Sequence, residues 1–281
     1  MNIKNGLYLE RAENGNIKFS ANYENGKLHG KYREYDINTG FLILSENYER
    51  GKKDGTSYYY NKNGDLKFKI DYKNGEKDGL AIYLYDNGNL EKIERYKNDK
   101  KEGQSIIFRE NGLIKSNFFY KNDKIDGLWI IFYPSGDIQS KTNYKNNFIH
   151  GVFEKFYKNG KIEEKNSYEN GEKNGISLKF HKNGNLKEFS VYKNNKLHGL
   201  FLEIDENKNI LSLRKYEDGK ILKDFSKKEN QEELKKETEQ DDYLKVLIKN
   251  TSWGKLEGNT VEEDWGNKIL EDKISSLENE R

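Results

Sequence analysis

The chain has 281 residues, of which 35% are charged and 33% are hydrophobic, and its net charge is +2. A net charge so close to zero excludes a strong global attraction to nucleic acid. The absence of cysteine excludes disulfides, thiolate metal ligands and a thiol nucleophile. The chain has 20 tyrosines and 14 phenylalanines but one proline, which is typical of ordered structure rather than a disordered linker. With a mean hydropathy of −1.11, we expect a thin, extended fold without a deep core.

A repeat of 24 residues runs from about Gly6 to Ile221. Short segments recur almost unchanged, as in YENGKLHG at 23–30 and YKNNKLHG at 192–199. Tyrosine and glycine each form a column with this period, and one extra residue falls between Tyr35 and Gly40. A fixed period of this length indicates a repeat architecture. The tyrosine column consists of Tyr23, Tyr48, Tyr72, Tyr96, Tyr120, Tyr144, Tyr168, Tyr192 and Tyr216, and the glycine column of Gly30, Gly55, Gly79, Gly103, Gly127, Gly151, Gly175 and Gly199.

Each repeat contains two turn signals. The dipeptide Asn-Gly occurs eleven times, and both of its residues tolerate the positive φ of a type I′ hairpin turn. Where the glycine is missing, the slot holds Asp99, Asp123, Asn147 or Asn195, which also tolerate the left-handed region. Two turns in 24 residues leave two strands of roughly 8 to 10 residues. The sequence therefore predicts an all-β repeat, an elongated single-layer antiparallel meander of about nine hairpin units.

The strand register follows from arithmetic on the turns. If a hairpin is centred on Asn87-Gly88, paired residues have numbers that add to 175, because 87 and 88 add to 175. Tyr96 then faces Gly79, and Leu90 faces Tyr85. A glycine inside a strand leaves a hole, and a ring laid across that hole restores contact, the arrangement called aromatic rescue. We therefore interpret the two columns as a structural ladder in which each tyrosine covers a glycine.

Side-chain alternation assigns the remaining positions to two faces. One face carries the tyrosine and glycine columns, and the other carries Leu128, Ile130, Phe132 and their equivalents, followed by mostly polar residues on the next strand. Neither face is apolar enough to pack on a second sheet. We expect a sheet of about 18 strands, on the order of 85 Å long and in contact with water on both faces.

The repeat resembles the bacterial variant of the MORN repeat. The resemblance rests on the unit that starts at Tyr72 and on the word GKLHG at 26–30, in which two glycines four positions apart enclose a basic residue. It implies a repeat scaffold, since the eukaryotic relatives act as scaffolds. Families of this type include antitoxin or immunity proteins paired with secreted toxins, and surface or invasion-associated proteins. No unit carries the full eukaryotic pattern with its tryptophan, so the lipid association of some eukaryotic relatives is not transferred.

The period stops near the C-terminus, so we divide the chain into a repeat array, 1–223, and an acidic helical tail, 224–281. Residues 222–281 contain 11 Lys/Arg and 16 Asp/Glu, a net charge of −5, which leaves +7 for the rest. Capping-box patterns that begin at Ser226 and Thr260 predict two helices. One interpretation is that the tail caps the exposed last strand. The alternatives are a partner-binding element or a tail that folds back onto the basic sheet.

The histidines and carboxylates offer no reactive grouping. His29, His150 and His198 share one repeat slot, and two units separate the last two by roughly 19 Å along the sheet, too far for one metal ion. His181 replaces an aromatic residue in its own slot. The Asp and Glu residues are spread evenly, so no pair is distinguished as general acid and base. We predict no enzymatic activity, no metal and no cofactor.

The aromatic residues that vary between repeats are the candidate binding residues. Large aromatics on an open face are typical anchors for protein partners. The alternative is local cross-strand packing, which also favours aromatics. The candidates are Trp129, Tyr133, Phe153, Tyr157 and Phe201.

Together these observations predict a protein-binding repeat scaffold that binds no nucleic acid. The partner suggested by the family resemblance is a toxin that the chain neutralises. The alternative is association with an anionic membrane surface through the region of charge +7, or a role at the cell surface. No stretch reaches the roughly 18 apolar residues of a membrane span, and the first residues lack an apolar secretion segment. We expect a cytoplasmic location, or an exported one if a signal segment was removed.

Overall fold

The computed structural model describes residues 4–226, and these residues form antiparallel β-strands joined by tight turns. The predicted fold class, a single-layer antiparallel sheet of hairpin repeats, is confirmed. The predicted helices after Ser226 lie outside the described residues. The chain divides into two compact units, Met1–Phe148 and Ile149–Arg281, which are described separately.

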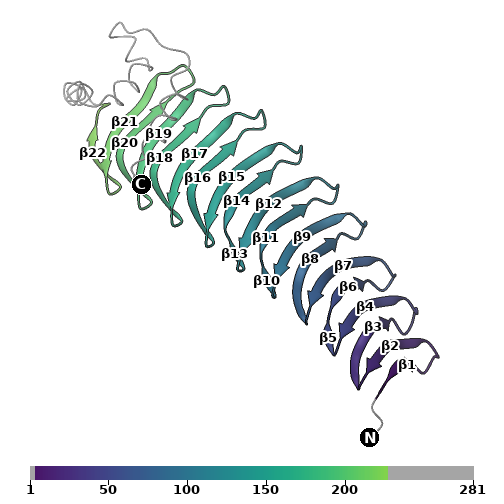
Figure 1. Cartoon of the computed structure of the whole chain (residues 1–281). Helices are drawn as coiled ribbons and strands as arrows, with labels where there is room; N and C mark the ends of the chain where they lie inside the picture. Colours follow the sequence, from purple (N-terminus) through teal and green to yellow (C-terminus); the bar gives the residue numbers. More distant parts are fainter. Residues whose placement is uncertain (1–3, 227–281) are drawn as a thin grey trace. The chain divides into compact units, whose positions relative to one another are not determined.

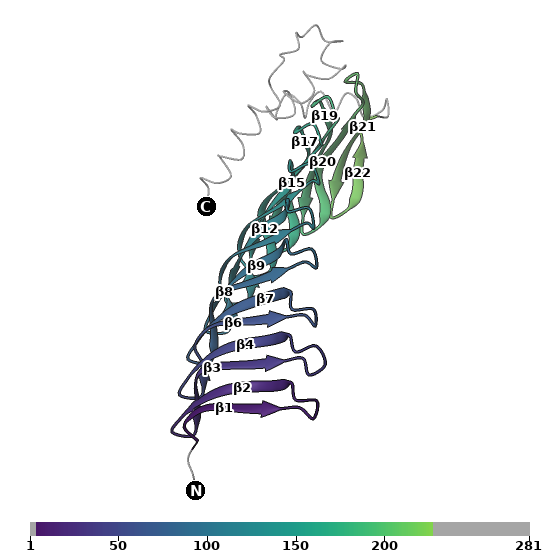
Figure 2. The same cartoon turned by 90° about the vertical axis from the view of Figure 1, so that its right-hand side faces the viewer.

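Unit 1 is a meander in which successive arms pair in chain order. Three arms consist of two strands, β5 and β6, β10 and β11, and β13 and β14, and both strands of each arm pair with the strand before it. Figure 2 shows the loops that follow β1, β3 and β6 stacked at one edge. Its strands are β1 (Gly6–Arg11), β2 (Ile17–Glu24), β3 (Lys27–Tyr35), β4 (Leu42–Glu49), β5 (Lys52–Lys53), β6 (Gly55–Tyr60), β7 (Leu66–Lys73), β8 (Glu76–Leu84), β9 (Leu90–Lys97), β10 (Lys100–Lys101), β11 (Gly103–Phe108), β12 (Ile114–Lys121), β13 (Lys124–Ile125), β14 (Gly127–Phe132) and β15 (Ile138–Lys145).

Unit 2 repeats the same pattern, and its strands also follow one another in chain order (Figure 1). Its last strand ends within one residue of the predicted end of the repeat array. The strands are β16 (Phe148–Phe156), which begins at the boundary between the units, β17 (Ile162–Glu169), β18 (Glu172–Phe180), β19 (Leu186–Lys193), β20 (Lys196–Ile204), β21 (Ile210–Glu217) and β22 (Lys220–Asp224).

The register agrees with the turn arithmetic over most of each hairpin. Gly79 pairs with Tyr96, and a glycine faces a tyrosine at the same place in the other hairpins. The sum of 175 fails at the end of β8, where Leu84 rather than Tyr85 pairs with Leu90. A β-bulge between Tyr83 and Leu84 causes the shift. The predicted pairing of Leu90 with Tyr85 is therefore wrong by one residue.

The two turns of each repeat differ in conformation. In the first, both residues have positive φ, as at Asn74 (53°) and Gly75 (96°), which is the expected type I′ turn. In the second, only the glycine does, as at Gly64 (89°), whose N–H donates to the carbonyl of Asn61 at 3.0 Å. One left-handed glycine after a longer loop is the geometry that accompanies a bulge. The prediction of two type I′ turns per repeat is therefore correct for one turn only.

At Gly79 the requirement for glycine has causes other than the predicted aromatic rescue. Gly79 has a φ of +126°, a conformation that side chains rarely adopt. A Cβ added to Gly79 would lie 2.7 Å from the Cβ of Asp71, eight residues earlier on the preceding strand. The atoms nearest to that position belong to Asp71 and not to the tyrosine opposite. The glycine is therefore required by its backbone conformation and by the close approach of the preceding strand.

Polar side chains at the turns join successive hairpins. The carboxylate of Asp123 accepts from the backbone N–H of Lys101 at 2.7 Å, and Asp99 and Asn195 accept from residues 22 positions earlier in the same way. At the opposite edge, the hydroxyl of Tyr85 donates to the carbonyl of Phe108 at 2.8 Å. Both kinds of bond connect a turn of one repeat to the next repeat, and neither was predicted from the sequence.

The two faces differ in how much they bury. We call the face with the tyrosine column the tyrosine face and the other the opposite face. In unit 1 the tyrosine face holds a small buried cluster of Ile70, Ala81 and Tyr96. In unit 2 the larger cluster lies on the opposite face and includes Leu178 and Phe189. The prediction that water contacts both faces is therefore wrong for this part of unit 2.

Candidate functional site

The tyrosine face is an alternation of rings and cations. The ammonium of Lys77 lies 5.0 Å from the centroid of the Tyr96 ring, and Lys101 lies 4.9 Å from that of Tyr120. A cation over an aromatic face contributes roughly 0.5–1 kcal/mol at an exposed site. These contacts occupy the tyrosine column with intramolecular partners, which favours a structural role for it.

Buried carboxylates on this face are fully paired. Glu94 is 3% exposed, and its carboxylate lies 2.7 Å from the ammonium of Lys101 and 3.3 Å from that of Lys92, and accepts from the hydroxyl of Tyr96 at 3.1 Å. Burial acts to raise the pKa of Glu94, but the bond from Lys101 and the two positive charges outweigh it, so this pKa is lowered. A carboxylate so strongly stabilised in its charged form is poorly suited to act as a general base.

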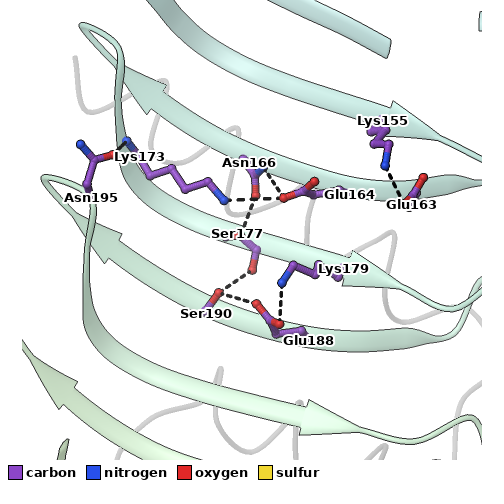
Figure 3. A network of polar contacts seen from close by, with 10 residues as sticks. All are labelled: Lys155, Glu163, Glu164, Asn166, Lys173, Ser177, Lys179, Glu188, Ser190 and Asn195. Atoms are coloured by element: carbon purple, nitrogen blue, oxygen red, sulfur yellow. Dashed lines mark hydrogen bonds and ion pairs between the residues drawn. The ribbon is translucent and has the colours of Figure 1, made fainter. Parts of the chain in front are cut away.

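Unit 2 extends the same pattern as a chain of polar contacts across β17, β18 and β19 (Figure 3). The amide of Asn166 donates to Glu164 at 2.8 Å and accepts from the hydroxyl of Ser177 at 2.6 Å. On the next strand Glu188 accepts from Lys179 at 2.8 Å. Because the buried polar side chains of this network bond to one another, the network stabilises the sheet. Within residues 4–226 no group of three or more His, Asp or Glu side chains is placed to hold a metal ion.

The predicted partner-binding aromatics on this face pack against the tyrosine column. The ring of Trp129 stacks on Phe118, with centroids 4.6 Å apart, and lies 5.4 Å from Tyr144. All three predicted aromatics here are half-buried and contact the tyrosine opposite the nearest glycine. This geometry favours the alternative of cross-strand packing, and partner binding by these residues stays a prediction. The equivalent contacts are Phe153 with Tyr168 at 6.4 Å and Phe201 with Tyr216 at 6.0 Å.

The other two predicted aromatics, Tyr133 and Tyr157, lie at the loop edge of the sheet and are half-buried. The hydroxyl of Tyr157 donates to the carbonyl of Phe180 at 2.7 Å. His181 occupies the same slot, and its Nε2 lies 2.9 Å from the carbonyl oxygen of Ile204. This repeat slot therefore links successive repeats. The recurrence of a ring with a polar atom at Tyr133, Tyr157 and His181 is the sequence signal that indicates this role. Binding of a partner by Tyr133 and Tyr157 is likewise untested.

The remaining histidines lie next to turns. Nδ1 of His198 lies 3.5 Å from the backbone N–H of Asp218, and Nδ1 of His29 lies 3.3 Å from the carboxylate of Glu24. In other repeats Asp54 and Asp126 accept from a turn N–H at the same place. The slot thus caps a turn where it holds Asp54, Asp126 or His198.

The opposite face of unit 1 provides a more open surface. Ile82, Ile93, Ile106 and Ile130 occupy one cross-strand row on β8, β9, β11 and β14, and Asn117 completes it between the last two. The four isoleucines are half-buried. On the described part of the chain no second layer of strands covers them. We call these four residues the isoleucine row.

Two larger side chains widen this surface. Phe119 and Leu128 flank the isoleucine row and are 39% and 38% exposed. Arg95 is exposed beside them, and Lys69 continues the row toward β7. An apolar centre with a charged rim is the usual anatomy of a protein interface. Sequence alternation placed Leu128 and Ile130 on this face, but their continuity with Ile82 and Ile93 follows from the strand register.

A family comparison now identifies the repeats. Six segments match the family described as MORN repeat variant, at residues 4–25, 53–74, 77–98, 125–146, 149–170 and 173–194. These six segments are similar to MORN repeats of the variant type. Each matched segment ends near a tyrosine of the tyrosine column, and five of the six segments begin with the residues that lead into a glycine of the glycine column. The MORN repeat thus coincides with the hairpin unit described above.

Comparisons with individual proteins give only weak likenesses. No curated protein matches the chain. Among solved structures, one described as TcdB2-TccC3-Cdc42 is 11% identical, with a TM-score of 0.21, over 75% of this chain and 13% of that one. A Tc holotoxin pore of Photorhabdus luminescens is 12% identical, with a TM-score of 0.21, over 75% of this chain and 12% of that one. The chain therefore spans about an eighth of those chains, and neither likeness carries an argument.

A helix long and apolar enough to cross a membrane does not occur among residues 4–226.

Proposed function

We propose that this MORN-repeat chain is a scaffold that binds another protein through the isoleucine row of unit 1. The observation that carries the proposal is that four aliphatic side chains from four strands form a half-buried row, with exposed Phe119 and Leu128 beside it. A sheet held together by strand pairing does not need such a row on a wetted face. A partner with an apolar stripe would remove it from water.

The chemistry of the partner follows from the composition of the surface. The centre of the surface is aliphatic, and Arg95 and Lys69 lie at its margin. We infer a partner whose apolar contact residues are bordered by acidic groups, since complementary charges at the rim increase the rate of association. The family resemblance supports one specific version, in which the partner is a toxin that binding neutralises.

The experiment compares two matched variants as baits. Leu128→Glu places a charge beside the isoleucine row, whereas Leu7→Glu places one on exposed β1, in the same repeat column of the opposite face. We expect a protein captured by the native chain to bind the Leu128 variant at least tenfold more weakly, because a charge buried beside the apolar contact costs about 1.4 kcal/mol or more. Binding to the Leu7 variant should be unchanged.

Two results would contradict the proposal. One is equal affinity of both variants for the captured partner. The other is that the chain captures anionic vesicles instead of a protein, that a higher salt concentration abolishes this binding, and that Leu128→Glu does not change it. That result would support membrane association through the basic region.

A further inference from the structure

The opposite face of unit 2 is buried more completely than a single layer accounts for. Leu178 and Phe189 pair across β18 and β19 and are 3% and 1% exposed. Leu202 and Leu213 pair across β20 and β21 and are 1% and 2% exposed. Phe225, just after β22, belongs to the same cluster and is fully buried. These side chains form a continuous apolar surface across four strands.

The matching positions of unit 1 show what the sheet alone provides. Leu178 and Phe189 occupy the same repeat slots as Ile82 and Ile93, with the same pairing, and yet the two isoleucines are only half-buried. On the tyrosine face of unit 1 a large stacked ring, that of Trp129, helps to reduce the exposure of Phe118 to 4% within one layer. The residues that pair with Phe189 are the smaller Leu178 and Leu202, which shield the sides of its ring but not its end. A phenylalanine ring at 1% exposure between two leucines therefore requires atoms above it, and domains supply such atoms as a second layer. The described strands of unit 2 form one layer only.

The chain itself offers a cover at this place. The described part ends at Ser226, directly after Phe225, so the 55 residues that follow leave from the margin of the apolar surface. These residues contain 10 Lys/Arg and 15 Asp/Glu, a net charge of −5, against +7 for residues 1–226. They also contain large apolar side chains, such as Tyr243 and Leu244, that match leucine and phenylalanine in chemistry.

We propose that segment 227–281 lies on the opposite face of β18–β21 and covers the apolar surface there. Tethering supports this occupant over a separate protein, because a segment joined to the margin of its site has an effective concentration in the millimolar range. Charge supports it as well, since the segment and the rest of the chain carry opposite net charges. The apolar surface of unit 2 is then satisfied within the chain, and the isoleucine row of unit 1 remains for a partner. The inference does not depend on the proposed function.

Cross-linking of the full chain tests this directly, because the natural chain has no cysteine to interfere. A single cysteine that carries a benzophenone is placed at Leu200→Cys, at the half-buried margin of the cluster. The matched control is Leu128→Cys, which occupies the same repeat column in unit 1. Ile176→Cys, in that column on β18, provides a second probe if the first variant fails to give a native circular-dichroism spectrum.

We expect light to link position 200 or 176 to peptides of 227–281 within one chain, at least fivefold more often than it links position 128. The proposal is overturned if the unit 2 positions link only to residues 4–226, if they link only to a second copy, or if positions 128 and 200 reach the segment equally.

Discussion

Replacing Gly79 by alanine tests why the glycine column exists. The new Cβ would adopt a backbone conformation with φ near +126°, which costs about 1–3 kcal/mol for a residue with a side chain. It would also lie 2.7 Å from the Cβ of Asp71, whereas ordinary contact begins at 3.4 Å, so the strands must separate by about 0.7 Å. Such overpacking adds about 1–3 kcal/mol. We therefore expect Gly79→Ala to lower the free energy of unfolding by about 2–6 kcal/mol.

The matched control is Gly112→Ala. Gly112 has a φ of +84°, and nothing lies within 4 Å of an added Cβ, so only the conformational cost of about 1–2 kcal/mol applies. Urea unfolding monitored by circular dichroism measures both variants. A double-mutant cycle with Asp71→Gly isolates the contact, and we expect a coupling energy of about 1 kcal/mol or more. Equal destabilisation by the two alanines, with no coupling to Asp71, would refute the close-approach explanation.

Three further predictions concern the polar contacts. Tyr157→Phe removes the hydroxyl that donates to the carbonyl of Phe180 and should cost about 1 kcal/mol of unfolding free energy, whereas Tyr8→Phe at the exposed first strand should change it by less than about 0.5 kcal/mol; similar values would exclude a linking role. Because the pKa of Glu94 is lowered on folding, its contribution to stability is present above its unfolded value of 4.5 and is lost as the pH falls below it. In urea titrations Glu94→Gln should therefore be less stable than the native chain near neutral pH, with a gap that narrows in acid; a gap independent of pH would contradict this. Asp123→Gly keeps the left-handed turn but loses the side-chain acceptor, so thermal unfolding should show a loss of at most about 1.5 kcal/mol, and Asp123→Ala a larger one, because alanine also disfavours the φ of 64°.

The sequence predicts the repeat and its pairing because both depend on local signals. Asn-Gly turns set the hairpin ends, and the period of 24 then brings Gly79 opposite Tyr96. The sequence does not predict the bulge at Leu84. The reason is that the Asn-Gly dipeptide occurs both in turns with one left-handed residue and in turns with two. The close approach of Asp71 to Gly79 is equally absent from the sequence pattern, because it depends on the position of the preceding strand.

The candidate surface is harder to predict than the fold. Variable aromatics such as Trp129 attract attention in a sequence, but the structure packs this ring on Phe118 and Tyr144. Half-buried isoleucines such as Ile106 look ordinary in each repeat and form a row only when the strands pair. The difference in burial between Ile93 and Phe189, which share a repeat slot, depends on what lies above the sheet, and no pattern within the repeat encodes that.

Hydroxyl-radical footprinting of the full chain, read by mass spectrometry, most directly tests the claim that the opposite face is open in unit 1 and covered in unit 2. Phenylalanine and leucine both react according to their exposure, so Phe119 can be compared with Phe189, and Leu128 with Leu202. We predict strong labelling of Phe119 and Leu128 and almost none of Phe189 and Leu202. Equal labelling within each pair would contradict the claim.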